Sequence, residues 1–183
     1  MTTASATEPR HHRRRCSGFL ADENAATAVE FGLVAAPFIA LLVAIMQTFL
    51  VIFAQQLLQT VVTQSSRLVL TNQAASMTQA QFATQVCNQV RIIFDCNSLM
   101  VDVQTYASFA AGNTSAPTLN FNAQGQVTNS WQFNPGSPGD IVIVRVMYQW
   151  SVFGGPLGFN LSNLSNGNRL IMASAAFQNE PSS

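Results

Sequence analysis

The sequence FGLVAAPFIALLVAIMQTFLVIF, residues 31–53, contains no charged side chain, and the first charge after it is Arg67. A bilayer core about 30 Å thick is crossed by roughly 20 apolar residues in a helix, so this stretch is long enough to span a membrane. A buried helix in a soluble protein is the alternative, but a core helix of this length rarely lacks a polar face. We therefore expect one membrane-spanning helix.

The basic residues are divided unevenly around this stretch, and the chain contains no lysine. Four of the eight arginines precede it, and the other four are scattered beyond it among four acidic residues. Short basic flanks stay in the cytoplasm, so we expect a cytoplasmic N-terminus and a C-terminal part that faces the outside, or the periplasm if the chain is bacterial. The cluster RHHRRR, residues 10–15, could also contact nucleic acid. However, the balanced charge of the remaining chain would not steer a polyanion, and no nucleic-acid partner is expected.

The apolar stretch belongs to a longer helix, which we expect to begin near Asn24 with Asp22 or Asn24 as its N-cap. Pro37 lies within this helix and is expected to bend it, because proline removes one backbone donor and crowds the preceding turn. After residue 53, AQQLLQTVVTQSSRLVL keeps apolar residues at helical spacing with glutamine and threonine between them. This pattern predicts an amphipathic stem that continues the helix to about Leu70.

A second helix is predicted from Thr78, a suitable N-cap, to about Phe94. Its apolar residues fall on one stripe at helical spacing. The stripe consists of Phe82, Val86, Val90 and Ile93.

Farther along the chain, apolar and polar residues alternate with the period of strands. The main strands are predicted over residues 99–109, 140–150 and 169–179, with shorter ones over 118–122 and 127–133. Helices followed by antiparallel strands define the α+β class.

The predicted organisation has three parts. Residues 1–25 form a basic cytoplasmic leader. The transmembrane helix and its stem occupy residues 26–72, and an exported α+β domain occupies residues 73–183.

Two cysteines, Cys87 and Cys96, follow the apolar stretch and would lie in an oxidising compartment. Their spacing suits a disulfide between the end of a helix and the loop after it, and two free buried thiols are the alternative. A metal site is not expected, because the predicted exported part contains no histidine that could join the two thiols.

The side chains available for catalysis beyond residue 53 are few, because neither histidine nor lysine occurs there. Histidine triads, histidine metal sites and lysine bases are therefore excluded. A carboxylate pair could still catalyse glycoside hydrolysis. Asp95, however, falls in a predicted loop and Asp102 at a solvent-facing strand position, which predicts that both are solvated. We expect no enzymatic role and no cofactor.

Four aromatic residues, Trp131, Trp150, Phe153 and Phe159, fall in the predicted exported part. They could form an adhesive or partner-binding patch. Large aromatic side chains more often fill cores and anchor loops, and this second role is the one we expect.

Glu30 stands directly before the apolar stretch, within NAATAVEFGLVAAPF, residues 24–38. A carboxylate drawn into a membrane costs a few kcal/mol unless it keeps water or gains a partner. Glu30 is therefore either solvated at the cytoplasmic interface or held there for an interaction.

The segment ADENAATAVEFGLVAAPFIALL, residues 21–42, resembles the N-terminus of TadE-like proteins, which are minor pilin-like subunits of the Tad (Flp) type IV pilus system. The resemblance implies that a membrane prepilin peptidase cuts between Ala25 and Ala26, where alanine replaces the glycine usual in the family. Glu30 would then be the fifth residue of the mature chain. Glu30 and Phe31 would belong to the assembly site.

The resemblance continues in LLQTVVTQSSRLVLTNQA and QFATQVCNQVRIIFDCNSLMVDVQTY, and again near the C-terminus in PGDIVIVRVMYQW and ASAAFQNEP. It implies three kinds of partner besides the membrane: other pilin or minor pilin subunits, the Tad inner-membrane assembly platform and the prepilin peptidase. An uncleaved single-pass scaffold of the pilus machine is the alternative function. A membrane-anchored exported enzyme is a remote alternative.

Cleavage would place a free α-amino group on Ala26, with a reference pKa near 8. In a bundle of apolar helices this amine could pair with Glu30 of a neighbouring subunit. Such a pair would fix the register of the helices, because an unpaired buried charge costs several kcal/mol.

Overall fold

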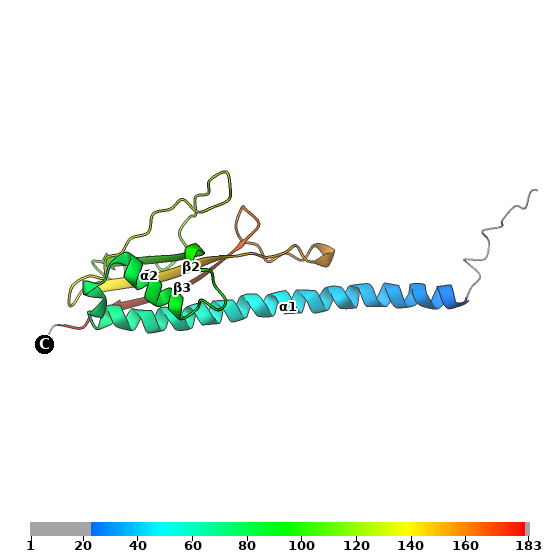
Figure 1. Cartoon of the computed structure of the whole chain (residues 1–183), viewed down its shortest axis with the longest axis horizontal. Helices are drawn as coiled ribbons and strands as arrows, with labels where there is room; N and C mark the ends of the chain where they lie inside the picture. Colours follow the sequence, from blue (N-terminus) through cyan, green and yellow to red (C-terminus); the bar gives the residue numbers. More distant parts are fainter. Residues whose placement is uncertain (1–22, 182–183) are drawn as a thin grey trace, which may run out of the picture. The chain divides into compact units, whose positions relative to one another are not determined.

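The computed structural model of the chain describes residues 23–181, with side chains from Thr27 onward (Figure 1). It begins with the helix α1, Glu23–Leu70, whose 48 residues correspond to about 72 Å of helix. The predicted long helix is therefore confirmed. Residues 1–22 of the expected basic leader, with the predicted cap Asp22, lie outside the described residues. Residues 23–25, the rest of the expected leader, form the start of α1.

Shorter elements follow α1. In chain order they are the 3₁₀ helix η1 (Gln73–Ser76), α2 (Gln79–Asn88), η2 (Cys96–Ser98), β1 (Leu99–Tyr106), β2 (Ile141–Trp150), η3 (Pro156–Gly158) and β3 (Arg169–Gln178). The predicted α+β class is confirmed.

The first part of α1 presents apolar side chains to its surroundings on all sides. Internal contacts divide the chain between Leu42 and Val43, and the first unit contains only this helical segment among the described residues. Within Thr27–Leu70, the most apolar window has a mean hydropathy of 2.4, and 11% of that window is buried. Among the described residues, α1 is the helix that is long and apolar enough to cross a membrane. A soluble core helix would be mostly buried.

The last part of α1 has one buried face and one exposed face, as the stem pattern predicted. Ala54, Leu58 and Val62 are fully buried and belong to the main core. Gln59 and Gln64 are exposed on the opposite side. The stem is therefore part of the packed domain rather than a free connector.

The three strands form an antiparallel sheet in the order β1-β2-β3. In its register, Val101 pairs with Val146, which in turn pairs with Ala173. These residues lie on the face that packs against α1 and α2, because side chains alternate between the two faces of a strand. This face and the stem share the main core with Phe82 of α2.

The opposite face of the sheet is also covered, by the long connection between β1 and β2, residues 107–140. Met100 and Met147 are buried there with Leu119 of the connection. The prediction that Asp102 faces solvent is wrong, since it lies on this face and is 1% exposed. Alternation along a strand shows that a side chain lies on the opposite face of the sheet. It does not show whether that face is exposed to solvent or covered by another segment.

Part of this connection was predicted as short strands over residues 118–122 and 127–133. The described residues show only isolated bridges there, Phe121 with Val127 and Val103 with Phe133. The side chain of Asn129 explains the difference, because it accepts from the backbone N–H of Asn120 and donates to the carbonyl of Thr118. These hydrogen bonds take the place of a strand partner.

The second helix is shorter than predicted. Thr78 is its N-cap, with a capping box completed by Gln81, as the sequence indicated. The helix ends at Asn88 rather than near Phe94, because the chain must turn back to bring Cys96 close to Cys87. A helix rising 1.5 Å per residue would instead separate positions 87 and 96 by about 13 Å.

The earlier end of α2 also changes which side chain enters the core. Ile93, predicted on the buried stripe, is 37% exposed, whereas Phe94 is 2% exposed. Similarly, β1 ends at Tyr106 before the predicted Phe109, because Ser108 begins a turn by accepting from the N–H of Ala111.

Candidate functional site

Glu30 lies on α1 with its side chain exposed. Its helical neighbours three and four residues on, Leu33 and Val34, are also exposed, as is the adjacent Phe31. A carboxylate thus stands among apolar side chains on a helix surface that is open to another molecule. Such a surface can pack against an apolar helix and offer the carboxylate to a cation carried by it.

The other predicted positions in this segment are less completely described. Ala25 and Ala26 fall in the first turn of α1, but their side chains lie outside the described residues. Pro37 lies inside α1, as expected. The bend at Pro37 and the cut between the two alanines stay predictions.

The two cysteines beyond α1 form a disulfide, with their Cα atoms 5.5 Å apart. Cys87 is buried near the end of α2, and Cys96 is exposed at the start of η2. The bond therefore fastens the turn that leads from α2 into the sheet, in agreement with the pairing expected from the spacing.

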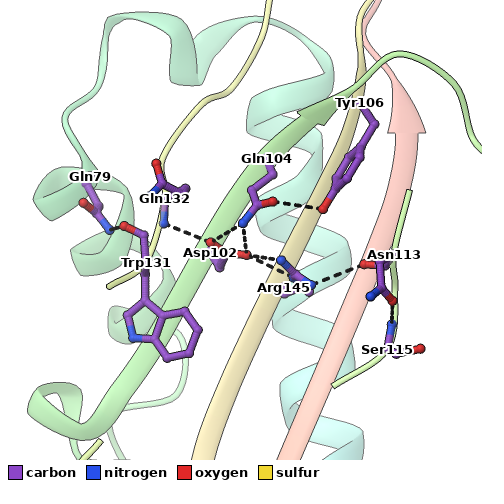
Figure 2. Close-up of polar contacts among 9 residues, drawn as sticks. All are labelled: Gln79, Asp102, Gln104, Tyr106, Asn113, Ser115, Trp131, Gln132 and Arg145. Carbon is purple, nitrogen blue, oxygen red and sulfur yellow. Dashed lines mark hydrogen bonds and ion pairs between the residues drawn. The ribbon is translucent and has the colours of Figure 1, made fainter. Parts of the chain in front are cut away.

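A buried ion pair joins β1 and β2 on the face under the long connection (Figure 2). Arg145 donates from Nε and Nη2 to Oδ2 of Asp102, at 3.0 and 2.5 Å. The two residues are register partners, and both side chains are under 10% exposed. Gln104 donates to both carboxylate oxygens at 3.1 Å. The carboxylate is thus well supplied with donors, as a buried charge requires.

The same pair holds both ends of the long connection. Near its beginning, the carbonyl of Asn113 accepts from Nη1 of Arg145 at 3.3 Å. Near its end, the backbone N–H of Gln132 donates to Oδ1 of Asp102 at 2.9 Å (Figure 2). The sequence contains a signal for this ion pair, because β1 carries one acidic residue and β2 one basic residue among apolar neighbours.

An open cleft of about 630 Å³ lies where this face meets η2, the connection of residues 107–140 and the connection between β2 and β3, residues 151–168. Its lining includes Trp131, Tyr148, Gln126 and Gln149, and it contains no acidic or basic side chain. Without a charged group, the cleft offers hydrogen bonds and aromatic contact but no carboxylate or amine for acid–base chemistry.

The four aromatic residues singled out in the sequence are divided between the interior and the surface. Trp150 packs in the main core, 5.9 Å from the ring of Phe94, and Trp131 packs in the smaller core on the second face. Phe159 is half-buried. Phe153 is exposed, so the core role is confirmed for the tryptophans and wrong for Phe153.

The structure thus defines a class of protein: a chain with one helix long enough to span a membrane, joined to a small α+β domain. The family model described as TadE-like protein matches residues 25–67, from the start of α1 through Glu30 and Pro37 into the stem. This match confirms the predicted resemblance to TadE-like proteins over residues 25–67, and the resemblance predicted for the later segments stays a prediction. Searches among curated proteins and among solved structures found no match.

Proposed function

We propose that this chain is a minor pilin-like subunit that takes part in assembling a Tad pilus. In this proposal α1 spans the bacterial inner membrane with its N-terminus in the cytoplasm, and the domain lies in the periplasm. Its partners are other pilin or minor pilin subunits, the Tad inner-membrane assembly platform and the prepilin peptidase.

The observation that carries the proposal is the position of Glu30. It lies within the family match and is exposed on a helix surface whose neighbouring apolar side chains are exposed too. Helices of several subunits can pack along this surface, and the α-amino group of a processed Ala26 can pair with Glu30 of a neighbour. In the low dielectric of a helix bundle the two charges attract strongly, and leaving one of them unpaired costs several kcal/mol.

Processing can be tested by the mass of the protein from membranes, with and without the cognate peptidase. Because the chain contains no lysine, the α-amino group is the one primary amine in either form, and amine labelling with peptide mapping locates the N-terminus. Loss of residues 1–25 only with active peptidase supports the proposal. A full-length chain in both cases would favour the uncleaved scaffold.

The role of Glu30 can be tested separately with Glu30→Ala, using Glu180→Ala as the control for an exposed carboxylate in the domain. We expect Glu30→Ala to be processed and folded but to abolish piliation, whereas Glu180→Ala assembles pili. Normal piliation by Glu30→Ala would remove the pairing account.

The scaffold alternative is favoured by one feature of the sequence, the methyl group of Ala25 at the position where the family has glycine. An uncleaved chain would keep the basic leader and would dock pilus components through its domain. Its N-terminal amine would then belong to Met1 and not to Ala26, so the proposed pairing with Glu30 would not form, and Glu30→Ala and Glu30→Gln would leave assembly intact.

A non-enzymatic role is also part of the proposal. Asp102 is bound to Arg145, Asp140 accepts from the N–H of Ser137, and Asp95 caps η2. Each of these carboxylates has a structural use, and the cleft lined by Trp131 and Tyr148 has no charged lining. Glu30→Ala leaves all three carboxylates in place. Loss of piliation by this variant with the domain still folded would agree with a role in assembly and not in catalysis.

A further inference from the structure

The cleft lined by Trp131 and Gln149 has no task in the proposed function. Its volume of about 630 Å³ falls within the range of about 300–1,000 Å³ that is usual for ligand sites. The lining includes four carboxamides and two hydroxyl groups, and among the described residues it contains no charged side chain. These six residues are Asn97, Ser98, Gln126, Gln149, Ser151 and Asn168. Most ligand pockets have a largely apolar wall, so this wall suits a polar ligand.

Gln149 is held in place through the oxygen of its side chain. Its Oε1 accepts from Nδ2 of Asn166 at 3.3 Å and from Nδ2 of Asn168 at 3.4 Å. Asn166 also donates to the carbonyl of Gly125 at 3.4 Å, which joins the two connections that border the cleft. Among the described residues, no group accepts from Nε2 of Gln149. A carboxamide nitrogen can donate two hydrogen bonds, so Nε2 can donate to a ligand.

Gln126, on the connection of residues 107–140, is held in the same way. Its Oε1 accepts from Nδ2 of Asn122 at 3.0 Å, and in the described part of the chain its Nε2 has no acceptor. Asn168 has the complementary arrangement. Its Nδ2 donates to Gln149, and no group within residues 23–181 donates to its Oδ1. The cleft thus offers two amide donors and one amide acceptor that are positioned before a ligand arrives, which lowers the entropic cost of binding.

Trp131 adds an aromatic surface to these amides. Its carbonyl accepts from Nε2 of Gln79 at 3.1 Å. Its side chain packs against the smaller core on the second face and stays half-buried. In Figure 2 the indole ring lies toward the start of β1, away from the pair of Asp102 and Arg145. The face of an aromatic ring is negative and attracts C–H groups that carry a partial positive charge.

We propose that this cleft binds an uncharged saccharide. A sugar hydroxyl both donates and accepts hydrogen bonds, which matches the amide donors and the amide acceptor, and the C–H face of a sugar ring can stack on the indole of Trp131. A carboxylate, phosphate or ammonium group would lose its water here without gaining a counter-charge. A peptide would gain less, because peptide recognition uses pockets for side chains. The inference concerns the domain and is independent of leader cleavage and of Glu30.

The test uses the full chain with Trp150→Phe, so that Trp131 is the one tryptophan left. The protein is kept in a polyoxyethylene detergent, because a detergent with a sugar headgroup would compete for the cleft. The emission of Trp131 is followed during titration with maltose, cellobiose, lactose and N,N′-diacetylchitobiose. Chitobiose without its acetyl groups and cellobiouronic acid are the charged counterparts, and a capped glycine-serine peptide is the peptide counterpart. A chain with Trp131→Phe, which keeps Trp150, controls for indirect effects.

We expect at least one neutral disaccharide to change the emission of Trp131 in a saturable way and to leave that of Trp150 unchanged. Gln126→Ala and Gln149→Ala should each weaken this binding about fivefold, the effect of losing one neutral hydrogen bond. Gln132→Ala is the matched control and should bind as before, because Gln132 is exposed on the same connection but does not line the cleft. Gln126 is also exposed, so its replacement tests the site without disturbing a core.

Three results would overturn the proposal. The first is no response to any of the four neutral disaccharides. The second is equally tight binding of the charged counterparts, and the third is binding that neither Gln126→Ala nor Gln149→Ala weakens. A response to the capped peptide alone would assign the cleft to a peptide and would overturn the proposal as well.

Discussion

The sheet buries its two faces by different means. Toward α1 and α2 it buries valines against Leu58, Val62 and Phe82, with no charged side chain in the cluster. Under the connection of residues 107–140 it buries Asp102 and Arg145 beside a small apolar cluster. Apolar burial is non-directional and scales with area, whereas the ion pair is directional and binds particular backbone groups. We infer that the first face supplies most of the stability and the second positions the connection.

The largest effect is expected when the helix-covered face loses its largest buried side chain. Phe82→Ala should lower the free energy of unfolding by about 4 kcal/mol, the combined cost of lost burial and a cavity. Urea unfolding of the full chain in detergent, followed by circular dichroism, measures this. Phe109→Ala, at an exposed position, is the control and should change stability by less than about 0.5 kcal/mol.

Breaking the ion pair on the second face should cost somewhat less. Asp102→Ala leaves Arg145 buried without its counter-charge, and we expect a loss of about 3 kcal/mol in the same unfolding measurement. The double variant Asp102→Leu with Arg145→Met should recover most of that loss, because a buried pair is often replaceable by apolar residues.

The double variant also tests the positioning role directly. Trp131 belongs to the connection and packs against the small apolar cluster beneath it, and Trp150 packs against the main core, so chains that keep one tryptophan report on one face each. We expect the emission of Trp131 to shift to longer wavelength in the stable double variant, while that of Trp150 stays unchanged. An unchanged Trp131 would mean that the apolar cluster alone holds the connection.

The disulfide joins α2 to the start of the sheet and adds stability without belonging to either face. Cys87→Ser with Cys96→Ser should lower the free energy of unfolding by about 2 to 3 kcal/mol, the chain-entropy value for so short a loop. Reduction of the unmodified chain should give a similar loss. A loss in the double serine variant that exceeds the loss on reduction would point to poor packing of the serines.

The smallest effect is expected from Asn129, whose side chain bonds two backbone groups in the connection. Asn129→Ala should cost about 1 to 2 kcal/mol, the usual value for hydrogen bonds of this kind. Amide hydrogen exchange should increase at Asn120, whose N–H loses its partner. Exchange at Val144, in the central strand, should stay slow.

Features with a strong local signal were predictable from the sequence. The bounds of α1, the cap at Thr78 and the three strands all follow from periodicity and end residues. The family resemblance also led to Glu30, which has no signal of its own beyond a charge beside an apolar stretch.

Features that depend on the rest of the chain were missed. The burial of Asp102 required knowing that a connection rich in asparagine folds back over the sheet. The exchange of Ile93 for Phe94 in the core required knowing that the disulfide ends α2 early. In both cases a tertiary contact decided the outcome against the local pattern.

The hydrogen bond from Gln55 to the carbonyl of Met172 has a consequence for how copies of this chain can associate. β3 is an edge strand, and an uncovered edge is a template for another strand. Here the side chain of Gln55 in α1 binds one carbonyl of that edge, while β1, at the other edge, exchanges hydrogen bonds with the backbone of Gln132 and Asn134 through Val103. Each edge is therefore interrupted at one residue, which makes it a poorer template for an added strand.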